Sequence, residues 1–348
     1  GNTGLRDNFR HDLRSSFSHR NDGCRNDDGR DEIASESIHE EPYEQNHAQQ
    51  SQLCNGLISE LLRMNYRYER IKRFLEQENF QGFTKKDLFI KNFITKAWGQ
   101  DIAALSNMAE VIRNTQYENM KGGSSRKLKR EKIFLIDRVV QFAIHPKMNP
   151  WKKSIEKVTD FNHYGYYLEH LNIILGCYQQ VAGDQYLELN TRVTRYLRDE
   201  SLSQPNAHAR LIPHVKMRWA ADQAAIIYSI WLYDQNNRTT YHKELKERWI
   251  EYMENHGKHK ETGMYITEVM GTKDYSDQPR GCSHAYMCYY MEHFDGVKGQ
   301  EQWELFKKHM LVKRLGFWGF REYLPDYKGK WTPDSGPIIL GIGVAATG

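Results

Sequence analysis

Two stretches decide the fold that we expect for this chain: NHYGYYLEHLNIILGCYQ at Asn162–Gln179 and WAADQAAIIYSIWLYD at Trp219–Asp234. In both, apolar residues recur three and four positions apart, which is the spacing of one face of an α-helix. The helical spacing starts at Leu53 and recurs along the chain. Beyond that first helical segment, and with the two quoted stretches included, the helices that we expect cover roughly 86–116, 128–144, 164–182, 185–198, 217–234, 240–256, 282–294 and 300–312. Strand signals are weak throughout. The succession of helices predicts an all-α protein built from antiparallel helix pairs.

The arrangement that we expect for these pairs is an (α/α)6-type toroid. The chain has no strict repeat of the tetratricopeptide or ankyrin kind, and weakly similar helical hairpins are typical of a closed toroid, where an inner ring of helices holds the site and an outer ring supports it. We expect residues 49–348 to form this single domain. The small-residue segment Gly341–Gly348, expected to be a helix, needs tight burial against neighbours, yet the sequence stops there without a polar end. We therefore expect the toroid to be incomplete at its C-terminus and the sequence to end inside a longer protein.

Residues 1–48 have a different composition. They are rich in Asn, Asp, Arg, Ser and Glu, lack Trp, and have Phe9, Phe17 and Tyr43 as their only aromatic residues. Such a segment buries too little apolar area to offset the entropy lost on ordering. We expect it to be a flexible polar arm.

Composition excludes several classes of function. The formal net charge of +4 is too small for a nucleic-acid-binding surface, which needs a concentrated basic face. Five cysteines without metal-type spacing predict neither a disulfide framework nor a zinc site, and nothing in the sequence calls for a cofactor. No apolar run reaches the roughly 18 to 20 residues of a membrane span. We expect a soluble chain; a processed exported protein would have the same composition, and a homo-oligomer is compatible with it.

Asp222 is the leading catalytic candidate. On a helix it shares a stripe with Ala225, Ile226 and Ser229, so its carboxylate faces the core or a cavity. A buried carboxylate without partners has a raised pKa and can act as an acid or base near neutral pH. The alternative is a structural carboxylate that binds Arg218 or the backbone N–H groups at the helix start.

His170 is the second candidate, because it shares an apolar stripe with Ile173, Ile174 and Cys177 and points to the interior. It could be a hydrogen-bonded core histidine or a catalytic group. Other polar side chains lie near the start of the same helix, and we expect Tyr166 to line a substrate site there. We expect the same of Trp219, at the start of the helix that carries Asp222.

His284 repeats this arrangement on a third helix, where it shares a stripe with Met287, Cys288 and Met291. Pro279 and Gly281 interrupt the preceding chain, so that Arg280 lies at the mouth of this helix and could orient a polar or anionic substrate group. Cys288 and His284 could also be a nucleophile and its base, although packing explains this cysteine equally well.

The last cluster lies in GFWGFREYLPDYKGKWTPDSGPIILGIGVAATG, residues 316–348. In an extended segment Arg321 and Glu322 face opposite ways, so one of them can line the site while the other pairs outward. Asp334 is expected either to cap a helix or to contact substrate, with Trp331 beside it. The mixture of aromatic and charged side chains is typical of the rim of a pocket.

A family resemblance links these segments. HLNIILGCYQQVAGDQY, RWAADQAAIIYSIWLYD, TGMY, PRGCSHAYM, GFREY and DSGPIILGIGVAATG follow one another in an order that resembles bacterial α/α-toroid proteins related to linalool dehydratase/isomerase. The resemblance covers roughly residues 130–348. It implies a deep cavity at the ends of the inner helices, where Asp222, His170, His284 and Asp334 would converge. The catalytic cysteines of the dehydratase have no clear counterpart here, which weakens the case for terpene chemistry.

These observations support three functional hypotheses. The first is a cofactor-independent acid/base enzyme, a dehydratase, isomerase or lyase, that acts on a hydroxylated organic substrate. The second is a glycan-processing hydrolase or epimerase, in which aromatic side chains stack on a sugar-like substrate and two carboxylates act together. The third is a non-catalytic binding or scaffold protein. Perturbed pKa values at Asp222 and the two histidines would favour an enzyme.

Overall fold

The computed structural model describes residues 69, 100–115, 125–269, 277–327 and 337–347, all within one unit, Gly56–Gly348. The predicted arm and two of the predicted site residues, Trp331 and Asp334, lie outside the described residues. The arm and the domain boundary at residue 48 therefore stay predictions.

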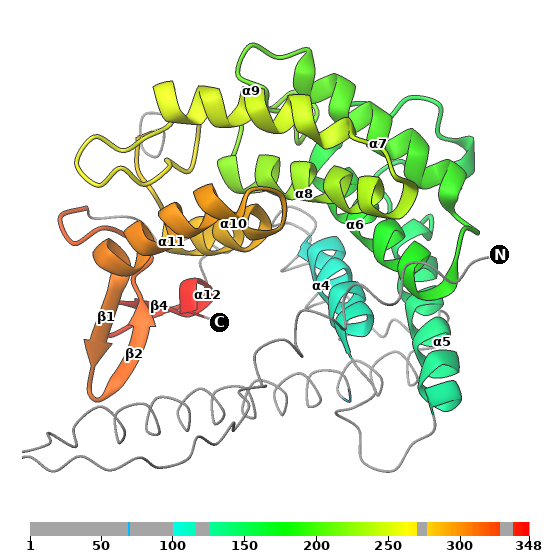
Figure 1. Ribbon diagram of the computed structural model, residues 1–348, viewed down its shortest axis with the longest axis horizontal. Helices are drawn as coiled ribbons and strands as arrows, with labels where there is room; N and C mark the ends of the chain where they lie inside the picture. The colour runs from blue at the N-terminus through cyan, green and yellow to red at the C-terminus, as the bar shows by residue number, and fades with distance from the viewer. Residues whose placement is uncertain (1–68, 70–99, 116–124, 270–276, 328–336, 348) are drawn as a thin grey trace, which may run out of the picture. The chain divides into compact units, whose positions relative to one another are not determined.

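The described part of the chain is predominantly helical, which confirms the predicted fold class (Figure 1). The long helices are α4 Gln100–Asn114, α5 Ser125–Ile144, α6 Gly165–Ala182, α7 Leu187–Leu202, α8 Ala220–Asn237, α9 Tyr241–His256, α10 Gly281–Phe294 and α11 Gly296–Met310. A short 3-10 turn, η2, spans Ile155–Lys157. The predicted helix 300–312 begins earlier, at Gly296, because the Asp295 side chain caps it by accepting a hydrogen bond from the Lys298 N–H.

The helices form two layers. α4, α6, α8 and α10 pack each against the next and make an inner row. α5, α7, α9 and α11 pack on the outside of this row, each against an inner helix that adjoins it in the chain. Connections of only a few residues join α6 to α7, α8 to α9 and α10 to α11, so each pair is antiparallel. This alternation of inner and outer helices is that of an α/α toroid; closure into six pairs stays a prediction.

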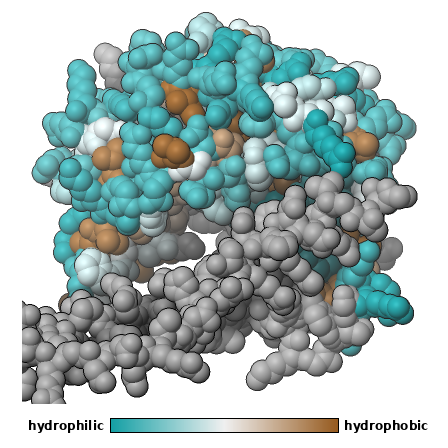
Figure 2. All heavy atoms as spheres, viewed as in Figure 1, coloured by the Kyte–Doolittle hydropathy of each residue, from teal (hydrophilic) through white to brown (hydrophobic). Residues whose placement is uncertain are grey.

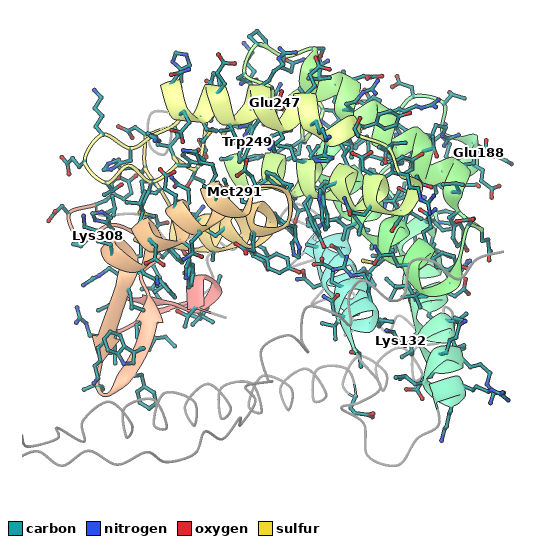
Figure 3. The ribbon with its side chains drawn as sticks, in the orientation of Figure 1. Lys132, Glu188, Glu247, Trp249, Met291 and Lys308 are labelled. Carbon is teal, nitrogen blue, oxygen red and sulfur yellow. The ribbon has the colours of Figure 1, made fainter. Side chains whose placement is uncertain are left out.

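Burial explains why the inner row is so apolar. α6 and α8 are buried on nearly their whole circumference, whereas α7 and α9 bury one stripe each. Trp249, on the side of α9 that faces α8, is fully buried (Figure 3). The outer helices leave their polar stripes to solvent, and hydrophilic residues predominate on the face shown in Figure 2. Among the described residues, no helix combines the length and apolarity needed to cross a membrane.

Three inner helices, α6, α8 and α10, each begin against the loop that returns from the outer partner of that helix. The N–H of Gly165 donates to the carbonyl of Arg210 (3.2 Å), that of Ala220 to Thr267 (3.1 Å), and that of Gly281 to Glu322 (2.9 Å). A Cβ at Gly165 or Gly281 would lie 2.3 or 2.0 Å from a carbonyl oxygen of that loop, so both positions require glycine. The three contacts bring the starts of α6, α8 and α10 to the same edge of the fold.

The C-terminal segment contains strands that the sequence did not predict. β1 Leu311–Arg314 pairs antiparallel with β2 Phe317–Phe320, and β3 Ile338–Ile339 with β4 Ile342–Gly343. The first hairpin turns through Leu315 and Gly316, both with positive φ, the backbone of a two-residue hairpin turn. The predicted helix Gly341–Gly348 is wrong in its extent: α12 covers only Val344–Thr347, because the residues before it form β4.

Candidate active site

A carboxyl pair lies near the starts of α6 and α8. Glu169 belongs to the second turn of α6 and Asp222 to the first turn of α8, and the packing of these helices brings their carboxyl groups into direct contact. Glu169 is only 1% exposed, whereas Asp222 is partly exposed. Burial, and then the charge and hydrogen bond of Asp222, raise the pKa of Glu169 well above its ordinary value. Two carboxylates in contact cannot both ionise at neutral pH, so the pair holds a proton.

His170 borders this pair. Its Nε2 atom lies 3.5 Å from the Oε1 atom of Glu169, and the edge of the Tyr166 ring packs against the imidazole with the ring centres 5.0 Å apart. Burial lowers the pKa of His170 to about 3, so the ring is neutral at physiological pH. Its Nδ1 atom and the Oε2 atom of Glu169 are buried, and neither has a protein N–H or hydroxyl group in hydrogen-bonding position. The polar groups beside Asp222 are therefore not saturated by the fold.

Trp219 immediately precedes α8 and is held by a third carboxylate. Its Nε1–H donates to Oε1 of Glu268 over 3.2 Å, and the two residues also form an isolated antiparallel bridge. Glu268 is buried, while Trp219 is partly exposed. The indole ring is thus fixed in orientation three positions before Asp222.

Arg280 and Glu322, both predicted to bind substrate, bind each other. The Nε and NH2 atoms of Arg280 each lie 2.9 Å from Oε1 of Glu322. Cys282 donates to the same carboxylate from its backbone N–H and from its thiol, both over 3.1 Å. Burial raises the pKa of Glu322, against the opposing effect of Arg280. The guanidinium therefore neutralises a buried charge and anchors the start of α10. Arg321, which directly precedes Glu322 in the sequence, is partly exposed.

His284 lies elsewhere, between α10 and α11. Its Nε2 atom is 3.3 Å from the carbonyl oxygen of Gln302, and its ring packs on Phe306. It is 2% exposed, and burial lowers its pKa to about 4. The stripe that His284 shares with Met287, Cys288 and Met291 is buried throughout, with Met287 and Met291 in the main hydrophobic core and His284 against α11. The structure thus brings together His170, Asp222, Tyr166 and, close by in sequence, Trp219, but packs His284 into the interior of a helix pair.

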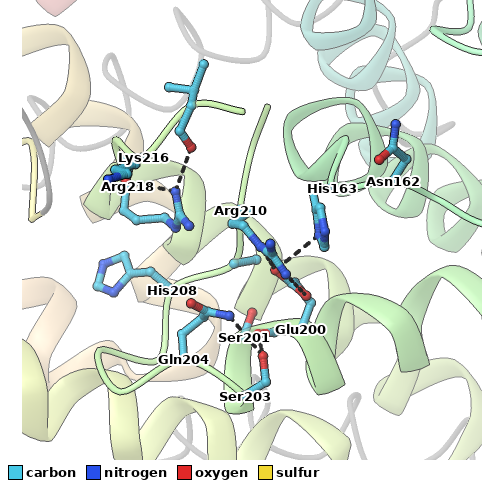
Figure 4. A network of polar contacts seen from close by, with 12 residues as sticks. Asn162, His163, Glu200, Ser201, Ser203, Gln204, His208, Arg210, Lys216 and Arg218 are labelled. Atoms are coloured by element: carbon cyan, nitrogen blue, oxygen red, sulfur yellow. Dashed lines mark hydrogen bonds and ion pairs between the residues drawn. The ribbon is translucent and has the colours of Figure 1, made fainter. Parts of the chain in front are cut away.

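A polar network holds the connection that leads into α8 (Figure 4). Arg210 donates to Glu200 over 2.7 Å, and His163 lies 3.4 Å from the same carboxylate. Arg218, considered as a partner for Asp222, donates through NH1 to the carbonyls of its own loop at residues 215–217. This network fixes the residues that precede Trp219 and so the start of α8.

Glu169 and Glu268 are the residues that sequence analysis left out of the site. The signal for Glu169 was its place beside His170 at a helix start, but only the packing of α8 shows that its carboxyl group meets Asp222. No apolar stripe or motif in the sequence indicates Glu268 as a site residue. Among the described residues, no group of three or more His, Cys, Asp and Glu side chains could hold a metal ion.

Comparisons with known proteins show a distant likeness to solved structures and none to a known family or curated sequence. No protein-family model matches the chain, and no curated protein sequence matches it significantly. Among solved structures, cellobiose 2-epimerase from Bacillus thermoamylovorans B4167 is similar with a TM-score of 0.43 and 10% sequence identity, over 64% of this chain and 62% of the epimerase chain. The chain therefore matches less than two thirds of that protein. The resemblance to linalool dehydratase/isomerase relatives stays a prediction.

Proposed function

We propose that this protein is an acid/base enzyme that acts on a hydroxylated organic substrate at the pair formed by Glu169 and Asp222. The observation that carries the proposal is the contact between two carboxyl groups, one buried with a raised pKa and the other partly exposed. Such a pair offers a proton donor and a proton acceptor together at neutral pH.

Dehydration or isomerisation fits this pair. The proton held by the carboxyl pair would pass to a substrate hydroxyl, which leaves as water, and a carboxylate of the pair would then take a proton from a neighbouring carbon to form the double bond. The two steps balance with the pair as the only donor and acceptor. Asp222 would face the substrate because it is the more exposed member, and Glu169 would hold the proton in reserve.

Neighbouring residues would position the substrate. The neutral His170 ring can donate or accept one hydrogen bond without adding charge. Tyr166 and Trp219, both partly exposed, would supply aromatic surface on either side of the pair. Four other residues remain predicted site residues: His284, Arg280, Glu322 and Arg321. The contacts of His284, Arg280 and Glu322 support a structural role, in which they hold the helices that carry the site.

A glycan-processing hydrolase or epimerase is the second candidate. Glycosidases separate their two carboxyl groups by about 5 to 10 Å to leave room for the sugar and water, whereas Glu169 and Asp222 are in contact. Glu322, a predicted site residue whose carboxylate could act with Asp222, is bound to Arg280. The geometry therefore favours the acid/base pair over glycoside hydrolysis. A non-catalytic scaffold is disfavoured because Glu169 and His170, beside Asp222, each keep a buried polar side-chain atom that no hydrogen bond of the fold satisfies.

Turnover measurements test the proposal. Screening hydroxylated organic compounds for loss of water or double-bond migration should identify a substrate. Asp222→Asn and Glu169→Gln should then each lower kcat at least about 100-fold, the usual loss when a general acid or base is removed. Glu254→Gln, which alters a carboxylate on the outer helix α9, should leave kcat unchanged. Unchanged kcat in both pair variants would show that the pair is not catalytic.

A further inference from the structure

A second polar cluster lies deeper among the inner helices and has no part in the proposed chemistry. We call it the Glu110 cluster. Glu110 of α4 accepts a hydrogen bond of 2.5 Å from the Tyr228 hydroxyl of α8 and another from Tyr289 of α10. Arg113 lies 3.7 Å from the same carboxylate. Side chains from three inner helices thus converge on one buried carboxylate.

The aromatic rings of this cluster pack against one another, and they differ in exposure. Tyr228 is fully buried and its ring packs on Tyr290 and His293, with ring centres 5.2 and 4.8 Å apart. Tyr289, in contrast, is 42% exposed although its hydroxyl is bonded to Glu110. An exposed phenol whose orientation is fixed by a buried carboxylate is a preorganised hydrogen-bonding group.

The Glu110 cluster and the carboxyl pair lie at different levels along the axes of the inner helices. Tyr228 follows Asp222 by six positions on α8, which at the rise of an α-helix is about 9 Å along the axis. Cys177, whose thiol pKa responds to Glu110 and Arg113, follows Glu169 by eight positions on α6, or about 12 Å. Tyr290 connects the two levels, because the charges of both Glu110 and Glu169 act on its hydroxyl.

Apolar and aromatic residues lie between the two levels, beside the buried polar residues Asn172 and Gln223, whose side chains bind within the fold. Ile173 on α6 and Ala225 on α8 lie at this intermediate depth, as does Tyr286 on α10, which is 46% exposed and stacks on Tyr290. Tyr286 and Tyr289 lie three positions apart and so share one face of α10. They offer an open aromatic surface between two polar ends.

We infer that Tyr289, held by Glu110, binds a second oxygen-bearing group of the substrate, and that Tyr286 and Tyr289 form the aromatic wall along which the substrate lies. The substrate class is then an elongated molecule with an apolar middle and a hydroxyl or carbonyl group at each end, about 9 to 12 Å apart. This inference rests on the proposed function, because the other end of the molecule must reach Asp222.

Binding of simple diols tests the inference without a known substrate. The probes are 1,8-octanediol, 1-octanol and 1,4-butanediol, whose Kd values can be measured by ligand-detected NMR. We expect the wild-type protein to bind 1,8-octanediol about three- to tenfold more tightly than either other compound, since one further hydrogen bond to a fixed partner changes Kd by a factor of this order. Tyr289→Phe keeps the ring, removes the hydroxyl and should abolish this preference.

Two further variants make the result decisive. Tyr241→Phe removes a partly exposed hydroxyl from the outer helix α9 and should keep the preference for the diol. Asp222→Asn should lose turnover while its binding of the diol still depends on Tyr289. If the wild-type protein shows no preference, or if Tyr289→Phe retains it, the inference is wrong even where turnover still requires Asp222. If turnover does not require Asp222 but the preference follows Tyr289, the proposed function fails and the binding site stands.

Discussion

The carboxyl group of Glu169 contacts that of Asp222 across the interface between α6 and α8. The two residues lie on different helices of the inner row, and each is placed by the fixed start of its own helix. The contact raises the pKa of the buried member and keeps a proton where the partly exposed member can use it.

Removing the negative charge of Asp222 should lower the pKa of Glu169. In Asp222→Asn the like charge is gone, but burial, the larger cause of the shift, remains. The pKa of Glu169 should therefore fall relative to the wild-type protein and stay above its ordinary value of about 4.5. Carbon-detected NMR of labelled glutamate carboxyl groups measures this. A pKa that does not change on substitution would show that the two carboxyl groups do not interact.

Glu169→Gln should stabilise the protein at neutral pH. The pKa of Glu169 is raised on folding, so the unfolded chain releases its proton first, and stability falls as the pH rises from about 4.5 toward the folded-state pKa. Glutamine removes this loss. We expect a free energy of unfolding about 1 to 3 kcal/mol higher in the variant at pH 7, with little difference at pH 4.5. Urea unfolding at both pH values tests this, and an equal difference at the two would contradict it.

Buried histidines should make the protein sensitive to acid. Burial lowers the pKa to about 3 for His170 and His208 and to about 4 for His284. Below about pH 6.5 the unfolded chain binds protons that the folded protein does not, so stability falls as the pH drops toward these values, by about 1.4 kcal/mol per pH unit for each histidine. His284→Gln should reduce this slope in denaturation curves between pH 6.5 and 4. A slope equal to that of the wild-type protein would refute the assignment.

Removing one member of the ion pair between Arg280 and Glu322 should lower the stability of the protein much more than replacing both members with apolar residues. Arg280→Met leaves the buried Glu322 carboxylate without its counter-ion and should destabilise the protein by about 3 to 5 kcal/mol. Glu322→Leu in the same chain should recover much of this loss. Arg198→Met, which breaks a pair with the exposed Asp199, should cost less than about 1 kcal/mol. Denaturation of the four proteins provides the measurement, and a double variant no more stable than Arg280→Met would contradict the expectation.

Alanine at the first residue of an inner helix should disturb the site. In Gly165→Ala or Gly281→Ala the new Cβ meets a carbonyl oxygen of the return loop, so the helix start must move. We expect a loss of about 2 kcal/mol or more in stability, in the range of overpacked sites. Gly296→Ala is a matched control at the first residue of α11, where the nearest atom is 3.8 Å away. Thermal unfolding of the three variants tests this, and equal melting temperatures would contradict it.

Sequence periodicity predicted the helices well because their burial is strong and regular. The predicted ranges 164–182 and 240–256 differ from α6 and α9 by only a residue at one end. The hairpin at residues 311–320 was missed because its strands are short and its turn depends on the backbone of Leu315 and Gly316, not on apolar alternation. Local patterns identify elements that bury a face along their own length, and they fail where pairing with another segment supplies the structure.

The site was predictable only in part, for a related reason. The stripes of His170 and His284 look alike in sequence, yet His170 lies beside the carboxyl pair and His284 lies against α11. Periodicity shows that a stripe is buried but not which neighbour covers it. Arg280 and Glu322 were both recognised as pocket candidates, while their mutual ion pair joins two distant segments. Such pairings follow from the packing of helices, which spacing within one helix does not reveal.

The hydrogen bonds that tie Gly165, Ala220 and Gly281 to the returning loops have an evolutionary consequence. Each of these three bonds closes a helical hairpin onto a segment of the same hairpin, so the start of the inner helix is held by its own return loop. Insertions placed after the closing carbonyl, before the following hairpin, would leave Glu169 and Asp222 in register. Descendants of such a chain could change the segments around the carboxyl pair while keeping the pair itself.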